Sequence, residues 1–267
     1  MADPLAEVEF LARSHNRIEI LATLAADAYT RRELGDAVDA SQPTIGRVLN
    51  DLSERGWVDY DGERYAATVT GAYVADGITA LRDRLATETR LRPIVDYFPT
   101  AAVDVGLDAF ADASITTPST PRPNAPIERM TELLAATDRA RLVSHAFNRD
   151  KLELLHERAG DGSVTVEGVF AREAIDAIAA DDRLAALLGD LLSTPDTEIR
   201  VTDEEIPFAV ELTDDRTHFL LRDEAGVVRG SLDTADQRVR EWAETAFRRY
   251  WENASQVSAG DIQSSVR

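Results

Sequence analysis

The stretch DASQPTIGRVLNDLSERGWVDYDGERY, residues 39–65, decides the fold of the N-terminal part of the chain. Ser41 stands where a helix cap is expected, and Pro43 falls in the first turn, where a missing backbone N–H costs little. Apolar residues then recur at helical spacing up to Gly56, and these are Ile45, Val48, Leu49 and Leu52. Beyond Gly56 the pattern alternates around Asp61-Gly62, a dipeptide favoured in two-residue hairpin turns. The stretch therefore predicts a helix followed by a hairpin.

Two further helices are predicted upstream of this stretch. An apolar stripe at helical spacing runs from Ile18 to Ala25. Thr30 and Glu33 have the spacing of a capping box, in which each side chain satisfies a backbone N–H at a helix start. Three helices followed by a hairpin is the order of a winged helix-turn-helix, which we assign to residues 1–69.

A long linking helix is predicted over residues 70–92, because Pro93 follows it. Its apolar residues fall at alternating spacings of four and three, and these are Val74, Ile78, Leu81 and Leu85. Such a seam suits packing against another helix, either of a second protomer or of the body of the same chain. We favour the homodimer, because helix-turn-helix proteins commonly read two half-sites.

Composition limits the chemistry of the chain. Its 267 residues suffice for two domains, they include no cysteine, and the four histidines show no metal-ligand spacing. We therefore expect neither a metal nor a cofactor. The chain also lacks an apolar stretch of about 18 residues, so we expect a cytoplasmic protein with no membrane partner.

The formal charge of −20 argues, taken alone, against a nucleic-acid partner. Lys151 is the single lysine among 29 basic residues, and 49 acidic residues are spread along the chain. This distribution resembles that of proteins from organisms that live in molar salt, although an ordinary acidic cytosolic protein is an alternative. In molar salt the Debye length is roughly 3 Å, so the general repulsion between protein and DNA is screened. The net charge therefore does not exclude DNA binding.

The second half of the chain predicts a different architecture. Residues 118–126 hold four prolines and indicate an extended connector. From residue 141 onward, strand-like and helix-like patterns alternate, which predicts a mixed α/β sheet domain over residues 93–254. The chain as a whole is thus of the α/β class, and we expect residues 255–267 to be a disordered tail.

The predicted third helix carries the residue types that read DNA. Gln and Asn pair with adenine and Arg with guanine in the major groove, and small hydroxyls near a helix start hold phosphate. The preceding helix begins with two arginines, and one arginine stands beside the wing tip. The predicted DNA contacts are Arg31, Arg32, Ser41, Gln42, Thr44, Arg47, Asn50 and Arg64. The alternative is a winged helix that binds another protein as an adaptor.

Two segments resemble known regulators. ELGDAVDASQPTIGRVLNDLSERGWVDYDGERYAATVTG is similar to archaeal winged helix-turn-helix regulators, which are related to the MarR, ArsR and TrmB groups. DASITTPSTPRPNAPIERMTELLAATDRARLV resembles the start of the effector domain in many haloarchaeal and methanogen regulators. The resemblance implies a dimeric, ligand-responsive transcription factor that binds operator DNA, with central carbon or sugar metabolism as a candidate for what it controls.

The second domain of such regulators looks like a degenerate phospholipase D fold. Phospholipase D enzymes act through a His-x-Lys pattern, whereas His145 is followed two positions later by Phe147. The chain also lacks a glycine-rich phosphate loop and a Gly-x-Ser-x-Gly motif. We therefore expect no enzymatic activity.

Loops that follow adjacent strands of an open sheet are the usual place for a ligand. Two such loops lie at residues 145–149 and 170–173, and each contains an arginine suited to a phosphate or carboxylate. The predicted effector contacts are His145, Phe147, Asn148, Arg149, Phe170 and Arg172. These arginines favour a small anionic metabolite such as a sugar phosphate, and the alternative is that they pair with surface carboxylates.

Overall fold

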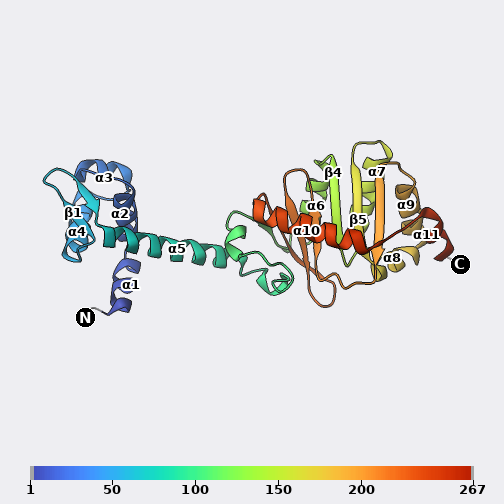
Figure 1. Ribbon diagram of the computed structural model, residues 1–267, viewed down its shortest axis with the longest axis horizontal. Helices are drawn as coiled ribbons and strands as arrows, with labels where there is room; N and C mark the ends of the chain where they lie inside the picture. The colour runs from blue at the N-terminus through green and yellow to red at the C-terminus, as the bar shows by residue number, and fades with distance from the viewer. Residues whose placement is uncertain (1–2, 266–267) are drawn as a thin grey trace. The chain divides into compact units, whose positions relative to one another are not determined.

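The computed structural model describes residues 3–265, and the chain divides into two compact units, Met1–Ala86 and Thr87–Arg267. Each unit is described by itself. The first contains α1 (Pro4–Ala12), α2 (His15–Ala26), α3 (Arg31–Ala37), α4 (Gln42–Glu54), β1 (Val58–Tyr60), β2 (Tyr65–Ala67) and most of α5 (Val69–Leu91) (Figure 1). Strands β1 and β2 pair antiparallel. The predicted winged helix-turn-helix is therefore present, whereas α1 was not predicted.

Most local signals of the winged unit act as expected, but Ser41 stands at the N-cap of α4 without a side-chain capping hydrogen bond. Thr30 and Glu33 form the capping box at the start of α3. The four apolar residues of α4 are at most 1% exposed and form the core together with residues of α2 and α3. Burying each such side chain contributes roughly 1.5–3 kcal/mol. Gly56 ends α4 with φ 69° and Gly62 forms the hairpin turn with φ 105°, both in the left-handed region that glycine tolerates.

The apolar seam of α5 is divided between two environments. Val74 and Ile78 are partly buried against the core of the winged unit. Leu81 and Leu85 are 44% and 55% exposed. The expectation of one continuous seam is thus corrected, since its first half serves the fold of its own unit.

The second unit is built on an eight-stranded mixed sheet with the order β10-β6-β5-β4-β7-β8-β9-β3. Strands β4, β5 and β6 run parallel, and the other pairs are antiparallel. Its strands are β3 (Ser114–Thr116), β4 (Arg139–Ser144), β5 (Thr165–Ala171), β6 (Thr197–Thr202), β7 (Ala209–Leu212), β8 (Thr217–Arg222), β9 (Val228–Thr234) and β10 (Ser255–Gln256). Its helices are α6 (Ala125–Ala135), α7 (Arg149–Gly160), α8 (Arg172–Ala179), α9 (Asp182–Leu192), α10 (Gln237–Asn253) and α11 (Ala259–Ser265). The predicted α/β class is confirmed.

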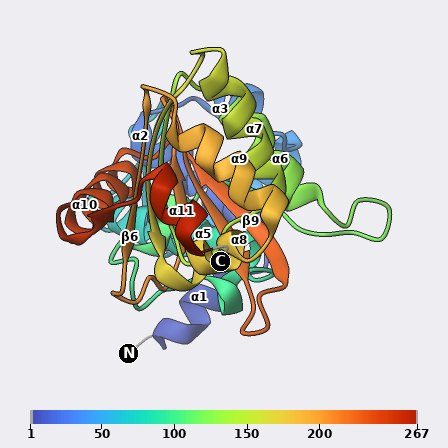
Figure 2. The same cartoon turned by 90° about the vertical axis from the view of Figure 1, so that its right-hand side faces the viewer.

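Helices cover both faces of this sheet, and Figure 2 shows α6, α7 and α9 on one side of the strands and α10 on the other. The side chains alternate accordingly. Leu142 of β4 belongs to the apolar cluster beneath α6, α7 and α9, and its neighbour Val143 belongs to the cluster beneath α10. Both faces are therefore buried, which explains why the central strands are apolar at consecutive positions.

Two expectations for the ends of this unit are corrected. The connector at 118–126 is shorter than expected, because Ser119 and Arg122 form a β-bridge and α6 begins at Ala125. The tail was expected to be disordered, yet β10 pairs with β6, and Val257 and Ile262 are 6% and 2% exposed. The apolar residues of the tail cover the edge of the sheet, and only its residues 266–267 lie outside the described chain. No helix among the described residues is long and apolar enough to cross a membrane.

Candidate nucleic-acid interface and ligand pocket

Two residues predicted to contact DNA, Arg31 and Gln42, instead join α3 to α4. Arg31 Nη2 donates to the carbonyl oxygen of Gln42 at 2.6 Å, and Gln42 Nε2 donates to the carbonyl oxygen of Arg31 at 3.4 Å. The Arg31 guanidinium also lies against Gly46, where a Cβ atom would come within 2.5 Å of Nη2. Arg31 and Gln42 therefore fasten the two helices to each other at an exposed surface.

Three predicted contacts remain open to a partner. Arg32, Arg47 and Asn50 are exposed, and none of them forms a hydrogen bond or ion pair within residues 3–265. Arg47 and Asn50 are three residues apart on α4, so they share one face of the helix. This face presents a cation and an amide together, opposite to the buried residues of α4.

The remaining predicted contacts are engaged within the winged unit. Ser41 Oγ and Thr44 Oγ1 are 3.0 Å apart and share a hydrogen bond. Arg64 donates to the carbonyl oxygen of Ala28 at 2.9 Å and lies 3.3 Å from Glu33 Oε1. Arg64 is thus tied to the base of α3, and its contact with DNA stays a prediction.

A cavity of about 310 Å³ lies where β4 and β5 end and α7 and α8 begin. It is lined by four of the six predicted effector contacts, and these are His145, Phe147, Asn148 and Arg149. The remaining lining residues are Ala146, Leu152, Glu173, Ala174, Ala177, Ile178 and Leu184. The loop after β4 therefore reaches a pocket, as the position after a strand predicts.

Hydrogen bonds within the protein fix the polar residues of this pocket. His145 Nδ1 lies 3.1 Å from the carbonyl oxygen of Phe208. Burial lowers the pKa of His145 below its usual range, and the hydrogen bond to Phe208 opposes this only in part. Asn148 caps α7, because its Oδ1 accepts from the backbone N–H of Lys151 at 3.1 Å.

The loop after β5 does not behave as predicted. Phe170 is fully buried and contacts Phe147 with its ring tilted by 31° and the ring centroids 4.4 Å apart, so it lies behind the wall of the pocket. Arg172 does not line the pocket and pairs with Asp203 at the surface. Arg172 therefore forms a surface ion pair, which was the alternative to an effector contact. The next residue, Glu173, does line the pocket.

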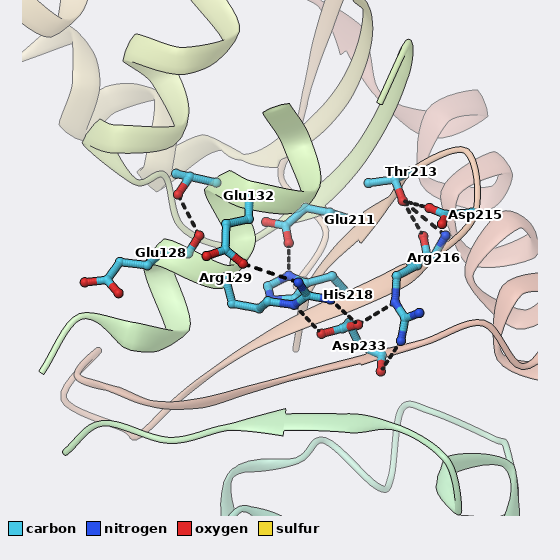
Figure 3. A network of polar contacts seen from close by, with 10 residues as sticks. Glu128, Arg129, Glu132, Glu211, Thr213, Asp215, Arg216, His218 and Asp233 are labelled. Carbon is cyan, nitrogen blue, oxygen red and sulfur yellow. Dashed lines mark hydrogen bonds and ion pairs between the residues drawn. The ribbon is translucent and has the colours of Figure 1, made fainter. Parts of the chain in front are cut away.

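Beneath α6 and α7 the sheet carries a buried polar network (Figure 3). Lys151 of α7 pairs with Glu211 of β7, which also accepts from His218 Nδ1 of β8. On β9, Asp233 accepts from Arg129 Nε and Nη2 at 2.9 and 3.1 Å, and from Arg216 as well. Each of Lys151, Glu211, His218 and Asp233 is at most 1% exposed. The network therefore fastens both helices to the sheet through compensated charges.

The pKa values of the two buried carboxyl groups follow from this pairing. Burial acts to raise both, but Lys151 and His218 lower the pKa of Glu211, and Arg129 and Arg216 lower that of Asp233. Both groups are thus carboxylates at neutral pH. The sequence contained a signal for this network, namely ionisable residues in the interior of the strands AVEL, THFLLR and VRGSLDT.

Comparison with known families supplies independent evidence. Residues 123–253 match the family model described as methanogenesis regulatory protein FilR1, middle domain. Residues 5–90 match the HVO_A0261 N-terminal domain. The resemblance to archaeal winged-helix regulators is confirmed. The two matches together support a DNA-binding transcriptional regulator, and no curated protein matches the chain.

Solved structures similar to this regulator include TrmBL2, an archaeal chromatin protein, with 18% identity over 96% of this chain and 100% of that chain and a TM-score of 0.43. Nuc from Salmonella typhimurium, a phospholipase D family member, shares 13% identity over 55% and 99% of the two chains, with a TM-score of 0.42. NucT from Helicobacter pylori shares 12% identity over 54% and 98%, with a TM-score of 0.43. These structural similarities do not indicate an activity for this chain.

The histidines of this regulator differ from the phospholipase D pattern throughout the sequence. The residues two positions after them are Arg17, Phe147, Arg158 and Leu220, and none is a lysine. His218 is moreover fully buried and hydrogen-bonded to Glu211. The His-x-Lys pattern of phospholipase D enzymes is therefore absent from the sequence, and the absence of enzymatic activity stays a prediction.

Proposed function

We propose that this chain is a cytoplasmic transcriptional regulator that binds operator DNA as a homodimer and responds to a small anionic metabolite. The observation that carries the DNA-binding part is the outward face of α4, where Arg47 and Asn50 are exposed and have no partner within the described chain. These residue types bond guanine and adenine in the major groove. For Arg32, at the start of α3, we expect a contact with the phosphate backbone.

The homodimer is proposed on the exposed half of α5. Leu81 and Leu85 are one helical turn apart and lie on the stripe that begins with Val74 and Ile78. Apolar residues at this spacing suit packing against the same helix of a second copy. Two copies of the winged unit would then read two half-sites of an operator.

The effector is proposed to bind in the cavity after β4. Arg149 supplies a cation at its rim, and the first backbone N–H groups of α7 favour a negative charge nearby. A sugar phosphate of central carbon metabolism carries the negative charge that these groups favour.

The acidic composition further leads us to propose a halophilic archaeon as the source, so the regulator works in molar KCl. The experiment that tests the function is retention of DNA from its own upstream region against random DNA in about 1 M KCl, repeated with a pool of small metabolites. We expect specific retention that a metabolite reduces. If no DNA is retained at any KCl concentration, the adaptor hypothesis takes its place, and a protein partner should then be recovered from nuclease-treated extract.

A further inference from the structure

The walls of the cavity after β4 are apolar. Phe147 and Leu152 of the α7 side face Ile178 of α8 and Leu184 of α9, with three alanines between them. A volume of about 310 Å³ lies at the lower end of the range for ligand pockets, roughly 300–1,000 Å³. The cavity thus has room for a small molecule with an apolar body.

One part of the rim offers hydrogen-bond acceptors. The Phe208 carbonyl can only accept, so His145 Nδ1 carries the proton of that hydrogen bond. Burial keeps the imidazole neutral at neutral pH, which leaves Nε2 with a lone pair. Glu173, on α8, lines the same cavity, is exposed, and forms no hydrogen bond or ion pair with another described residue. An imidazole nitrogen and a carboxylate together suit a cationic N–H donor.

Another part of the rim offers donors. Asn148 uses its Oδ1 to cap α7, so its amide nitrogen remains a donor. Arg149 lies 3.5 Å from Glu153, which Arg183 also contacts at 3.0 Å. Two guanidinium groups share one carboxylate there, and one positive charge is left in excess. An amide N–H and a guanidinium suit a carboxylate.

We propose that this cavity binds a small zwitterion with an apolar side chain, for which an apolar amino acid is the simplest form. The ligand carboxylate lies at Asn148 and Arg149, its ammonium at Glu173 and His145, and its side chain between the apolar walls. This inference rests on the ligand-responsive regulator and the pocket of the proposed function, but it replaces the anionic metabolite with a zwitterion.

A sugar phosphate fits the same cavity less well. Its hydroxyl groups would meet walls of Phe147, Leu152 and Ile178, where they find no hydrogen-bond partners. Its doubly charged phosphate would also face the carboxylate of Glu173. The zwitterion uses the donors and acceptors of the rim without either cost.

The test is calorimetric titration of the full chain at low and at high KCl. The probes are L-valine, L-leucine, L-isoleucine, L-methionine and L-phenylalanine, and glucose 6-phosphate serves for comparison. The best amino acid is then compared with its analogue lacking the amino group and its analogue lacking the carboxylate. We expect at least one amino acid to bind, and each analogue to bind about ten-fold more weakly or worse.

Two variants assign the ends of the ligand. Glu173→Gln should weaken binding of the amino acid but not of the anionic des-amino analogue, which gains affinity once the carboxylate is removed. Arg149→Gln should weaken binding of the amino acid but not of the cationic decarboxylated analogue, which gains affinity once the guanidinium is removed. The matched control is Arg122→Gln, which alters an exposed arginine that pairs with Glu128 and does not line the cavity, and it should change neither affinity.

Three outcomes overturn the zwitterion. Equal binding of the amino acid and its des-amino analogue leaves an anionic effector only. Binding of glucose 6-phosphate without any amino acid restores the sugar phosphate. No binding of any probe removes this ligand class, and DNA retention by the same preparation then decides separately whether the regulator function stands.

Discussion

The two units of the chain use their cations in opposite ways. On the winged unit, Arg32 and Arg47 are exposed and form no hydrogen bond or ion pair within the described chain. In the sheet unit, Lys151 and Arg129 are held by carboxylates that are at most 1% exposed. A solvated guanidinium is available to a phosphate or base, whereas a buried ion pair is already neutralised and serves the fold.

This difference explains how a chain of charge −20 can present a DNA-binding surface. What matters for a partner is the charge that is not already paired in the protein. The same reasoning separates Arg149, which shares Glu153 with a second arginine, from Arg172, which has Asp203 to itself. Changing one paired or unpaired cation at a time tests this distinction.

Removing the buried cation should have the largest effect. Lys151→Met removes the lysine partner of the buried Glu211 and leaves it only its contact with His218, so the free energy of unfolding should fall by about 3–5 kcal/mol in urea titration. Arg13→Met is the matched control, because its ion pair with Glu9 is exposed, and it should cost at most about 0.5 kcal/mol. Equal losses for the two variants would contradict a structural role for the buried pair.

Acid should weaken the same pair. Burial acts to raise the pKa of Glu211, but Lys151 and His218 outweigh it and lower the pKa to about 2, below the ordinary 4.5. A carboxyl group with a depressed folded pKa stabilises the fold above the unfolded value, and this is lost as pH falls through the folded pKa. The free energy of unfolding should therefore drop by on the order of 2–3 kcal/mol between about pH 4.5 and pH 2.

The matched variant for this prediction is Glu211→Gln, which keeps a polar group but removes the titration. Its free energy of unfolding should change less between the same pH values than that of the wild type. Parallel curves for the two proteins would show that other carboxyl groups, such as Asp233, cause the acid sensitivity.

On the winged unit, Arg47→Ala should weaken specific DNA binding by about 1–3 kcal/mol and relax the preference at one base position. Titration against an operator and its single-base variants measures both effects. Arg13→Ala, at the residue that follows α1, is the control and should bind as the wild type does. A uniform loss on all sequences would instead identify Arg47 as a phosphate contact.

The sequence predicted local structure well where a single element carries the signal. The capping box at Thr30, the hairpin at Gly62 and the buried face of α4 each depend on neighbours within a few residues. The rule that ligands bind at loops that follow strands likewise predicted the pocket that His145 and Arg149 line.

The sequence did not predict which residues distant along the chain come into contact in the fold. Glu211, His218 and Asp233 come together only through strand pairing, in the register Glu211 with His218 and His218 with Asp233. Arg172 forms an ion pair with Asp203, which lies 31 residues further along the chain, so its partner was not predicted. The tail appeared disordered because Val257 and Ile262 have no local pattern, and they pack against residues that are distant in sequence.

The smallest effect is expected for Arg64, because an internal partner already holds it. Arg64 contacts Glu33 and the Ala28 carbonyl, so Arg64→Ala should lower the free energy of unfolding by at most about 1 kcal/mol and change DNA affinity less than Arg47→Ala does. Glu33→Gln sharpens the test, since glutamine preserves the capping box with Thr30 but removes the charge that holds Arg64. If the freed Arg64 then strengthens binding to every DNA sequence, it acts as a phosphate contact that Glu33 restrains. Unchanged affinity would leave Arg64 as a link between the hairpin and α3, and would confine the DNA-binding cations to α4 and the start of α3.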